Sequence, residues 1–209
     1  MPQQAAQRPA RGSRSLRAGA ARRSPSRYRP AVGQRNVLVD GSSGSGKTAV
    51  CHELRRRGYQ ALNGDRDLAY RGDPRTGTPV DEPGTADEAE RAAWVSGHLC
   101  WKVEQVRALA DDRRESLTFF CGGSRNTASL LHLFDAVFVL DVDLATLHRR
   151  LDERPADEWA GRGRTAEREL VVRLHQTQED LPPGVRIDAA QPLARVVDEL
   201  LRRCGEDPG

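Results

Sequence analysis

The sequence predicts an α/β fold in which helices cover both faces of a five-stranded parallel sheet. Three observations support this prediction. Five short apolar runs of the kind that form buried strands alternate with segments of helical pattern. The first run leads through a glycine-rich turn directly into the first helical segment. The chain of 209 residues is long enough for one such domain with a sizeable core.

The predicted strands are apolar runs bounded by polar or turn-forming residues. They cover residues 36–40, 59–62, 117–121, 136–140 and 185–188. The second run leads into Asn63-Gly-Asp-Arg-Asp67, and Gly122-Gly123 ends the third. Because strands and helices alternate, consecutive strands should be parallel and joined by right-handed crossovers.

The predicted helices cover residues 48–57, 85–111, 143–153, 166–179 and 192–203. Thr85 is expected to cap the second helix, because Glu88 three residues later completes a capping box. Pro192 suits the first turn of the last helix. Residues 71–84 are dense in glycine and proline, and residues 154–164 combine arginine with glycine, so both segments are predicted to be loops.

The strongest motif lies between the first predicted strand and the first predicted helix. Gly41-Ser-Ser-Gly-Ser-Gly-Lys-Thr48 fits the pattern G-x-x-x-x-G-K-[ST], in which backbone N–H groups surround phosphate oxygens. Only two of the 33 basic residues are lysines, and one of them is Lys47 of this motif. Lysine therefore occurs in this arginine-rich chain at a motif position where a compact ammonium group suits phosphate binding better than a planar guanidinium. A glycine- and serine-rich surface turn is the alternative, but such a turn rarely ends in Lys-Thr after an apolar strand.

The motif predicts a binding site for a nucleoside triphosphate, with ATP and Mg²⁺ as the expected cofactors. The residues expected to bind the nucleotide are Gly41, Ser42, Ser43, Gly44, Ser45, Gly46, Lys47 and Thr48. Lys47 is predicted to be catalytic through the β- and γ-phosphates, and the Thr48 hydroxyl is predicted to be a metal ligand. A dinucleotide-binding G-x-G-x-x-G pattern is excluded, because no third glycine follows Gly46 at the required spacing.

Two aspartates follow the second predicted strand, at the edge of the sheet where the phosphate loop also opens. Phosphoryl transfer needs an acceptor hydroxyl held in line and a carboxylate that takes its proton. Asp65 is predicted to bind the acceptor and act as this base, and Asp67 is the second choice. A pair of helix-capping aspartates is the alternative. Arg125, just after the third strand, points to the same edge and is predicted to bind the acceptor or its phosphate.

Arginines gather after the fourth predicted strand. They are Arg149, Arg150, Arg154, Arg162 and Arg164. Guanidinium groups suit the oxygens of a phosphoryl group as charge spreads over them, and a loop with glycine hinges is able to close over a nucleotide. Arg150 and Arg154 are the predicted catalytic arginines. Most of the chain's other arginines are expected to be solvated surface charges.

The charge is distributed unevenly along the chain. Residues 1–35 hold nine arginines and no acidic residue, which leaves 24 basic against 30 acidic residues in 36–209. We predict a disordered extension over residues 1–35, a folded domain over 36–205 and a short tail over 206–209. Weak polyanion binding and organelle targeting are alternatives for the extension.

The remaining composition excludes several classes of protein. No run of 18 apolar residues exists, so no membrane span is expected. Four separated cysteines without a C-x-x-C pair suit reduced thiols, and a cytoplasmic location is expected. Tyr70, Trp94 and Trp101 are possible stacking partners for a base, although the helical spacing of the two tryptophans favours core packing.

These motifs resemble those of the small P-loop kinases, the nucleoside and nucleotide kinase-like superfamily that includes adenylate, shikimate and gluconate kinases. The resemblance covers about residues 36–204. Besides the phosphate loop, residues 63–67 look like the family's acidic segment after strand two, and residues 147–154 look like its arginine-bearing lid. Ile187-Asp-Ala-Ala-Gln-Pro192 is similar to a loop that often touches adenine, which implies that Asp188 contacts the cofactor. The fold implied is the three-layer P-loop fold, with the strand order 2-3-1-4-5 and an arginine-rich lid.

One segment departs from this resemblance. Many relatives carry an acidic residue at the end of strand three that helps to hold Mg²⁺ through water, whereas here the strand ends in Phe120-Cys121-Gly122-Gly123. Magnesium would then rest on Thr48, the phosphates and one of three aspartates. These are Asp40, Asp65 and Asp67.

The expected function is ATP-dependent transfer of the γ-phosphoryl group to a small acceptor that bears a hydroxyl or a phosphate. A nucleoside or nucleoside monophosphate is favoured. One alternative is a polynucleotide 5′-hydroxyl kinase, although the net acidic charge of residues 36–209 disfavours nucleic acid, whose contact is expected at most through the basic extension. Another is a nucleotide-binding switch without an acceptor. The GTPase version of that switch lacks an N-K-x-D segment.

Overall fold

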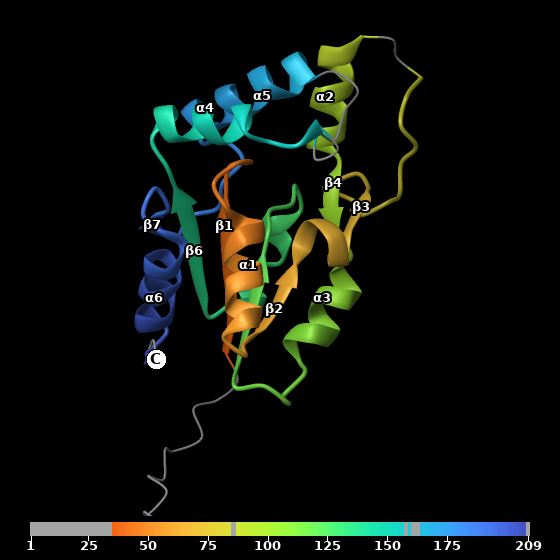
Figure 1. The fold of residues 1–209 in the computed structure, drawn as a ribbon. Coiled ribbons are helices and arrows are strands. Elements are labelled where there is room, and N and C mark those ends of the chain that lie inside the picture. Colours follow the sequence, from red (N-terminus) through yellow and green to blue (C-terminus); the bar gives the residue numbers. More distant parts are fainter. Residues whose placement is uncertain (1–34, 85–86, 157–158, 160–163, 208–209) are drawn as a thin grey trace, which may run out of the picture. The chain divides into compact units, whose positions relative to one another are not determined.

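The computed structural model describes residues 35–84, 87–156, 159 and 164–207 (Figure 1). The structural statements that follow concern these residues. The predicted extension up to residue 34, the expected cap Thr85 and the lid residue Arg162 lie outside them.

A five-stranded parallel sheet forms the centre of the domain. Its strands are β1 (Arg35–Gly41), β2 (Gln60–Asn63), β5 (Leu117–Cys121), β6 (Ala136–Asp141) and β7 (Val185–Asp188). Their order is β2-β5-β1-β6-β7. Counted along the sequence, this is the predicted order 2-3-1-4-5, and every pairing is parallel. All five residues of β5 are buried, as expected for a strand covered on both faces.

Helices cover both faces of this sheet, so the predicted three-layer fold is confirmed. They are α1 (Lys47–Arg56), α2 (Glu88–Gly97), α3 (Val103–Ala110), α4 (Leu144–Asp152), α5 (Arg164–Thr177) and α6 (Leu193–Arg203). One apolar cluster joins Leu54 of α1 and Val197 of α6 to Val39, and the other joins Val106 of α3 to Leu38. Each fully buried aliphatic side chain of this kind contributes about 1.5–3 kcal/mol. In Figure 1, α4 and α5 cross above the upper ends of the strands, near α2.

The single long helix predicted over residues 85–111 is wrong. Helix α2 ends at Gly97, and α3 begins only at Val103. Between them lies β4 (Leu99–Trp101), which pairs antiparallel with the short strand β3 (Ala69–Arg71). The chain therefore contains a second, two-stranded sheet that the helical spacing of its apolar residues had concealed.

The packing of Trp101 explains why the helical pattern fails here. Asn126 holds the extended backbone of Trp101 from both sides, since its Oδ1 accepts from the Trp101 N–H and its Nδ2 donates to the Trp101 carbonyl, each at 2.9 Å. The indole is fully buried, and two glycines lie against it. A Cβ atom on Gly64 would stand 2.0 Å from Trp101 Cζ2, and one on Gly122 would stand 2.9 Å from the same atom. Burial of so large a side chain outweighs helix propensity, which amounts to less than about 1 kcal/mol per residue.

This contact also positions the segment after β2. Gly64 opens a π-helical turn, Gly64–Leu68, that carries Asp65. Such turns are rare and often occur at functional sites. The paired strands β3 and β4 therefore pack, through Trp101, against the segment that the sequence predicts to bind the acceptor.

Replacement of Gly64 by alanine tests this packing. We expect Gly64→Ala to lower the free energy of unfolding by about 1–3 kcal/mol, because the new methyl group overlaps the indole. Gly97→Ala is the matched control, since a Cβ there meets no atom within 4 Å. Urea unfolding followed by tryptophan fluorescence measures both variants, and equal stability of Gly64→Ala and wild type would contradict the packing described.

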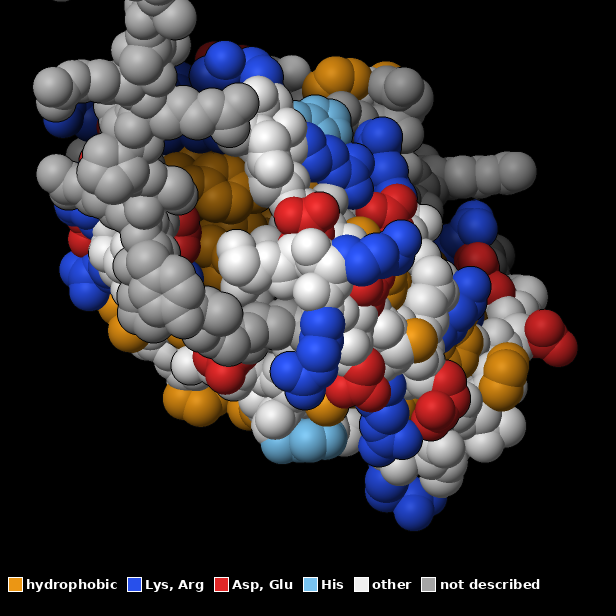
Figure 2. Space-filling model, turned by 90° about the horizontal axis from the view of Figure 1, so that it is seen from below, with side chains coloured by type: hydrophobic (Ala, Val, Ile, Leu, Met, Phe, Trp, Pro, Cys, Tyr) orange, Lys and Arg blue, Asp and Glu red, His pale blue; other side chains and the backbone are white. Residues whose placement is uncertain are grey.

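The surface is mixed in charge. On the face seen in Figure 2, the blue side chains of Lys and Arg are interspersed with the red ones of Asp and Glu wherever grey atoms do not cover it. Ion pairs such as Arg57–Asp198, at 2.6 Å, join the two kinds. The four cysteines are free and buried, as predicted. Within the described ranges, no helix is long and apolar enough to cross a membrane.

Candidate functional site

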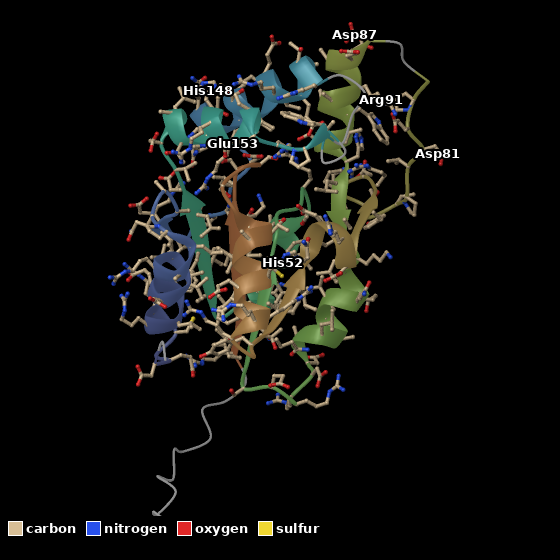
Figure 3. The ribbon with its side chains drawn as sticks, in the orientation of Figure 1. His52, Asp81, Asp87, Arg91, His148 and Glu153 are labelled. Carbon is tan, nitrogen blue, oxygen red and sulfur yellow. The ribbon has the colours of Figure 1, made fainter. Side chains whose placement is uncertain are left out.

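A cleft of about 950 Å³ opens at the carboxyl ends of the sheet strands. This is the usual place for a ligand in an open parallel sheet, and the volume is typical of small-molecule sites. The loop after β1, the turn after β2 and the turn after β5 form its floor, and residues of α2, α4 and α5 complete its walls. In Figure 3, Glu153 marks the roof of the cleft just after α4, and His52 marks α1 below it.

The loop 41–46 has the backbone geometry of a phosphate cradle. Gly44 and Gly46 take φ values of 86° and 107°, in the left-handed region that side chains disfavour. Gly46 precedes the first turn of α1, whose N–H groups have no intrahelical acceptor. These amides and the positive end of the helix dipole face the cleft, which suits an anion.

Lys47 supplies the charge that completes this cradle. Its Nζ donates to the carbonyl oxygens of Gly41 and Ser42, at 2.5 and 3.0 Å, so the ammonium is folded over the loop. In the described part of the chain, Lys47 makes no ion pair within 4 Å of a carboxylate. The positive charge is therefore available to a phosphate.

Asp40 is the most unusual ionisable group of the site. It directly precedes the loop, is only 2% exposed, and accepts the Gly41 N–H at 2.7 Å. Burial raises the pKa of this carboxyl group to about 7, against the opposing influence of the Lys47 charge and the Gly41 N–H, while Asp180 and Asp65 add to the increase. A buried carboxylate is costly unless a cation or several donors compensate it.

The pKa of Asp40 predicts how stability depends on pH. Between pH of about 4 and about 7 the folded state keeps a proton that the unfolded state has released, so stability falls as pH rises through this range. At about 1.4 kcal/mol per pH unit, the loss is on the order of 4 kcal/mol. We expect Asp40→Asn to remove most of this loss and to be more stable than wild type at pH 8.

Urea unfolding at pH 5 and pH 8, without metal ions or nucleotide, measures this difference. Asp65→Asn is the control, because it removes an exposed carboxylate from the same cleft. A pH dependence in Asp40→Asn as steep as in wild type would show that Asp40 is not the group responsible.

The two aspartates predicted to bind the acceptor have different environments. Asp65 is exposed, lines the cleft, and forms no hydrogen bond with any described residue. Asp67 does not line the cleft. Its carboxylate accepts the Asn63 N–H at 2.8 Å and forms an ion pair with Arg55 at 3.0 Å. Asp67 thus holds the turn and Arg55 locally, and its position outside the cleft favours Asp65 for the acceptor.

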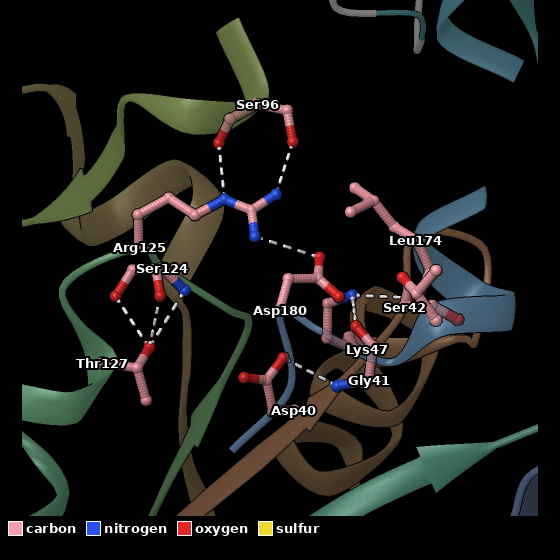
Figure 4. A network of polar contacts seen from close by, with 11 residues as sticks. Asp40, Gly41, Ser42, Lys47, Ser96, Ser124, Arg125, Thr127, Leu174 and Asp180 are labelled. Atoms are coloured by element: carbon pink, nitrogen blue, oxygen red, sulfur yellow. Dashed lines mark hydrogen bonds and ion pairs between the residues drawn. The ribbon is translucent and has the colours of Figure 1, made fainter. Parts of the chain in front are cut away.

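Arg125 lies in the cleft as the sequence predicts, within a network shown in Figure 4. Its guanidinium donates to the carbonyl and hydroxyl oxygens of Ser96, at 2.8 and 2.6 Å. It also forms an ion pair with Asp180 at 3.3 Å. In this view Asp180 lies between Arg125 on one side and Asp40 and Lys47 on the other. The Asp180 Oδ1 atom is buried without a hydrogen-bond partner in the described structure.

Sequence reasoning missed Asp180. This residue follows α5 in an irregular segment that belongs to no motif, and 55 positions separate it from Arg125. Only the ion pair with Arg125 and the electrostatic influence on Asp40 identify it as part of the site. Neither was visible in the sequence.

The two predicted catalytic arginines both line the cleft and both contact the phosphate loop. Arg150 donates to the carbonyl oxygens of Ser45 at 2.8 Å and Ala189 at 2.7 Å, and burial lowers its pKa. It therefore ties the loop to the segment after β7. Arg154 donates to the Ser43 hydroxyl at 2.8 Å.

Arg154 also has contacts within the lid region. It forms an ion pair with Glu167 of α5 at 3.5 Å, and its guanidinium lies 4.7 Å from the ring centre of Trp159. These contacts give both arginines a structural role in holding the loop. Their catalytic role stays a prediction.

The other predicted nucleotide-binding side chains differ in their access to the cleft. The Thr48 hydroxyl lines it and has no partner among the described residues, so it is free to bind a metal ion. The Ser42 hydroxyl instead contacts His175 Nδ1 of α5 at 3.0 Å. Asp188 does not line the cleft, and its carboxylate accepts from Ala190 N and Gln191 Nε2 at 3.0 and 3.2 Å. A contact of Asp188 with a cofactor is therefore not supported by its position.

The residues present fit a nucleotide with Mg²⁺. Mg²⁺ usually takes one or two protein oxygen ligands and completes its shell with water and substrate phosphates. Thr48 offers a hydroxyl, and Asp40 offers a buried carboxylate on the same cleft. In the described ranges no group of three or more His, Cys, Asp or Glu side chains is arranged to hold a metal by itself, which agrees with a metal that depends on the phosphates.

Comparison with known proteins shows which solved structures have a similar fold. No family model and no curated protein matches the sequence. Among solved structures, the shikimate kinase of Bacteroides thetaiotaomicron is similar with a TM-score of 0.51 and 15% identity, over 82% of this chain and 98% of that one. A sugar kinase from Janibacter sp. HTCC2649 has a TM-score of 0.46 and 20% identity, over 84% and 96%. Deoxyadenosine kinase from M. mycoides, determined with bound dATP, has a TM-score of 0.44 and 11% identity, over 82% and 100%.

The parallel sheet with its phosphate loop defines this chain as a P-loop protein. Within that class, it has the fold of the small P-loop kinases. The resemblance drawn from the sequence is thus confirmed for the fold. At 15% identity, the similarity does not extend to the substrate.

Proposed function

We propose that this protein is an ATP-dependent phosphotransferase that moves the γ-phosphoryl group to a small acceptor. The observation that carries the proposal is that a phosphate loop with an unpaired lysine and a carboxylate without hydrogen-bond partners face one cleft. The phosphate loop with its lysine suits the donor phosphates, and the carboxylate suits the hydroxyl of an acceptor. The fold of the small P-loop kinases agrees with this arrangement.

The donor side consists of Lys47, the loop amides and Thr48. Lys47 would leave its two carbonyl acceptors for the β- and γ-phosphates, where its charge stabilises the transferring group. Mg²⁺, held by the phosphates and the Thr48 hydroxyl, would neutralise charge on the phosphate oxygens.

Asp65 supplies the base of the proposed reaction. Its exposed carboxylate stands on the turn after β2, within the cleft and free of internal bonds. It would orient the acceptor hydroxyl and accept its proton as the new phosphate bond forms. This carboxylate lies beside the end of β5, since a Cβ on Gly122 would lie 3.1 Å from Asp65 Oδ1.

The arginines on the acceptor side favour an acceptor with an anionic group. Arg66, Arg71 and Arg125 line the same cleft as Asp65. Arg71 donates to the Val95 carbonyl at 3.1 Å and makes no ion pair with the described residues. Guanidinium groups bind phosphate and carboxylate oxygens in pairs. We therefore favour an acceptor that has both a hydroxyl and an anionic group over a neutral nucleoside. A nucleoside monophosphate fits the arginines as well, but if it accepted on its phosphate, Asp65 would orient it without acting as a base.

The proposed function is tested by ADP release with purified protein, Mg²⁺ and ATP, across a panel of nucleosides, nucleoside monophosphates, sugars and hydroxy acids. We expect release that depends on one class of anionic acceptor. Lys47→Ala should lose at least about 100-fold in turnover, because it removes a charge from the transferring phosphate.

Lys102→Ala is the matched control, because Lys102 is the only other lysine and is exposed at the start of α3. Normal turnover in Lys47→Ala would contradict the phosphate-loop mechanism. Slow release that no acceptor stimulates would instead indicate a nucleotide switch, and stimulation only by oligonucleotides would indicate a polynucleotide kinase.

The role of Asp65 has a separate test. We expect Asp65→Asn to lower turnover by about 100- to 10,000-fold while ATP still binds, because the amide cannot accept the acceptor proton. Asp67→Asn should keep most of the activity, since its side chain lies outside the cleft and an amide oxygen still accepts from Asn63. Steady-state kinetics and calorimetric ATP titration distinguish the two variants. A larger loss in Asp67→Asn than in Asp65→Asn would reverse the assignment.

A further inference from the structure

The two positions that follow strand β5 have no side chain. Cys121 is followed by Gly122 and Gly123, so this strand offers no carboxylate to the cleft. The space beside Gly123 is nevertheless filled by a carboxylate. A Cβ atom on Gly123 would lie 2.5 Å from Asp40 Oδ1 and 3.2 Å from Asp40 Oδ2. The side chain of Asp40, from the neighbouring strand β1, therefore reaches across to the place where a β5 side chain would begin.

The Asp40 carboxylate is held firmly in this position. Its Oδ1 accepts the Gly41 N–H at 2.7 Å, and the residue is 2% exposed. Its Oδ2 accepts no hydrogen bond from the residues that the structure describes, although the residue lines the cleft (Figure 4). A carboxylate buried in this way, with one oxygen unbonded, is costly unless a cation approaches it.

None of the residues that the structure describes supplies that cation at contact distance. Lys47 is the nearest basic influence on Asp40, but its ammonium bonds to the carbonyl oxygens of Gly41 and Ser42 instead, with no ion pair to Asp40 within 4 Å. Asp180 is another negative group close enough to act on Asp40. Arg125, the only described ion-pair partner of Asp180, is turned toward Ser96 as well. Among the described residues, the free oxygen of Asp40 thus has the Lys47 charge nearby but no cation in contact with it.

A second oxygen group without a partner lines the same cleft. The Thr48 hydroxyl stands on the first turn of α1, directly after Lys47, and is exposed. A hydroxyl and a carboxylate that flank a phosphate cradle are the protein ligands that Mg²⁺ accepts together with phosphate oxygens.

We propose that Asp40 is the carboxylate that holds the Mg²⁺ of the bound nucleotide, in place of an acidic residue at the end of β5. The proposal rests on the proposed function in one respect, namely that a nucleotide supplies the phosphate oxygens. In this chain the acid stands on β1 and not on β5, and the absence of a side chain at position 123 leaves room for it. Because Asp40 also bonds the first N–H of the loop, metal binding and loop geometry are linked through one side chain.

Calorimetric titration of ATP, with EDTA and then with Mg²⁺, tests this assignment without relying on turnover. We expect wild type to bind ATP more tightly with Mg²⁺ than without it. Asp40→Asn should bind ATP in EDTA at least as well as wild type, since it loses a negative charge, but its gain from Mg²⁺ should be smaller by about 10-fold or more. Asp65→Asn, the matched loss of a carboxylate from the same cleft, should keep the full gain.

A rescue variant makes the test independent of how well Asp40→Asn folds. In Asp40→Ala the side chain that blocks position 123 is gone, so Gly123→Asp fits in that background and returns a carboxylate to the end of β5. We expect Asp40→Ala alone to lose the gain from Mg²⁺ and the double variant to recover part of it. Melting temperatures check that both are folded.

The outcomes separate this inference from the proposed function. Equal gains from Mg²⁺ in wild type and Asp40→Asn overturn the role of Asp40 and leave the kinase proposal standing. Failure of wild type to bind ATP in either condition overturns the proposed function, and the role of Asp40 with it.

Discussion

The buried carboxylate of Asp40, one residue before a loop built to attract anions, constrains the whole upper end of this domain. It is nearly inaccessible to water, it bonds the first N–H of the loop, and burial raises its pKa to about 7. Burial of such a group next to a phosphate site would be destabilising by itself. We propose that a metal ion, together with the Lys47 charge, compensates it. The Gly41 N–H that bonds this side chain and the bare Gly123 beside it both accommodate it.

The acceptor side depends on a different constraint, which is steric. Trp101 fills the space above Gly64 and Gly122, and both glycines are required by its indole ring. The π-helical turn that begins at Gly64 places Asp65 in the cleft. Strand β3, which pairs with the strand that contains Trp101, places Arg71 in the same cleft. A packing contact in the core therefore sets the relation between the proposed base and the arginines that would hold an anionic acceptor. The donor and acceptor halves meet at the end of β5, where neither glycine has a side chain to obstruct them.

Much of this architecture could be predicted from the sequence, for physical reasons that differ between its parts. The five strands are continuous apolar runs buried on both faces, so their extent and order followed from periodicity and from the resemblance to P-loop proteins. The phosphate loop was predictable because its function fixes residue types at short spacing. The strand Leu99–Trp101 was not predictable, because its apolar spacing also fits a helix. Its extended conformation is determined by tertiary contacts with Asn126 and Gly64. Asp180 and the distinction between Asp65 and Asp67 depend on contacts between distant segments, which no local pattern records.

The central claim is that the main-chain amides of the loop and one ammonium group bind a polyanion, so that phosphates, more than the base, provide the affinity. Calorimetric titration of the wild-type protein with ATP and with adenosine, both in the presence of Mg²⁺, tests it most directly. We expect saturable binding of ATP at sub-millimolar concentration and no detectable binding of adenosine over the same range. Adenosine binding as tight as that of ATP, or the absence of ATP binding by folded protein, would contradict it.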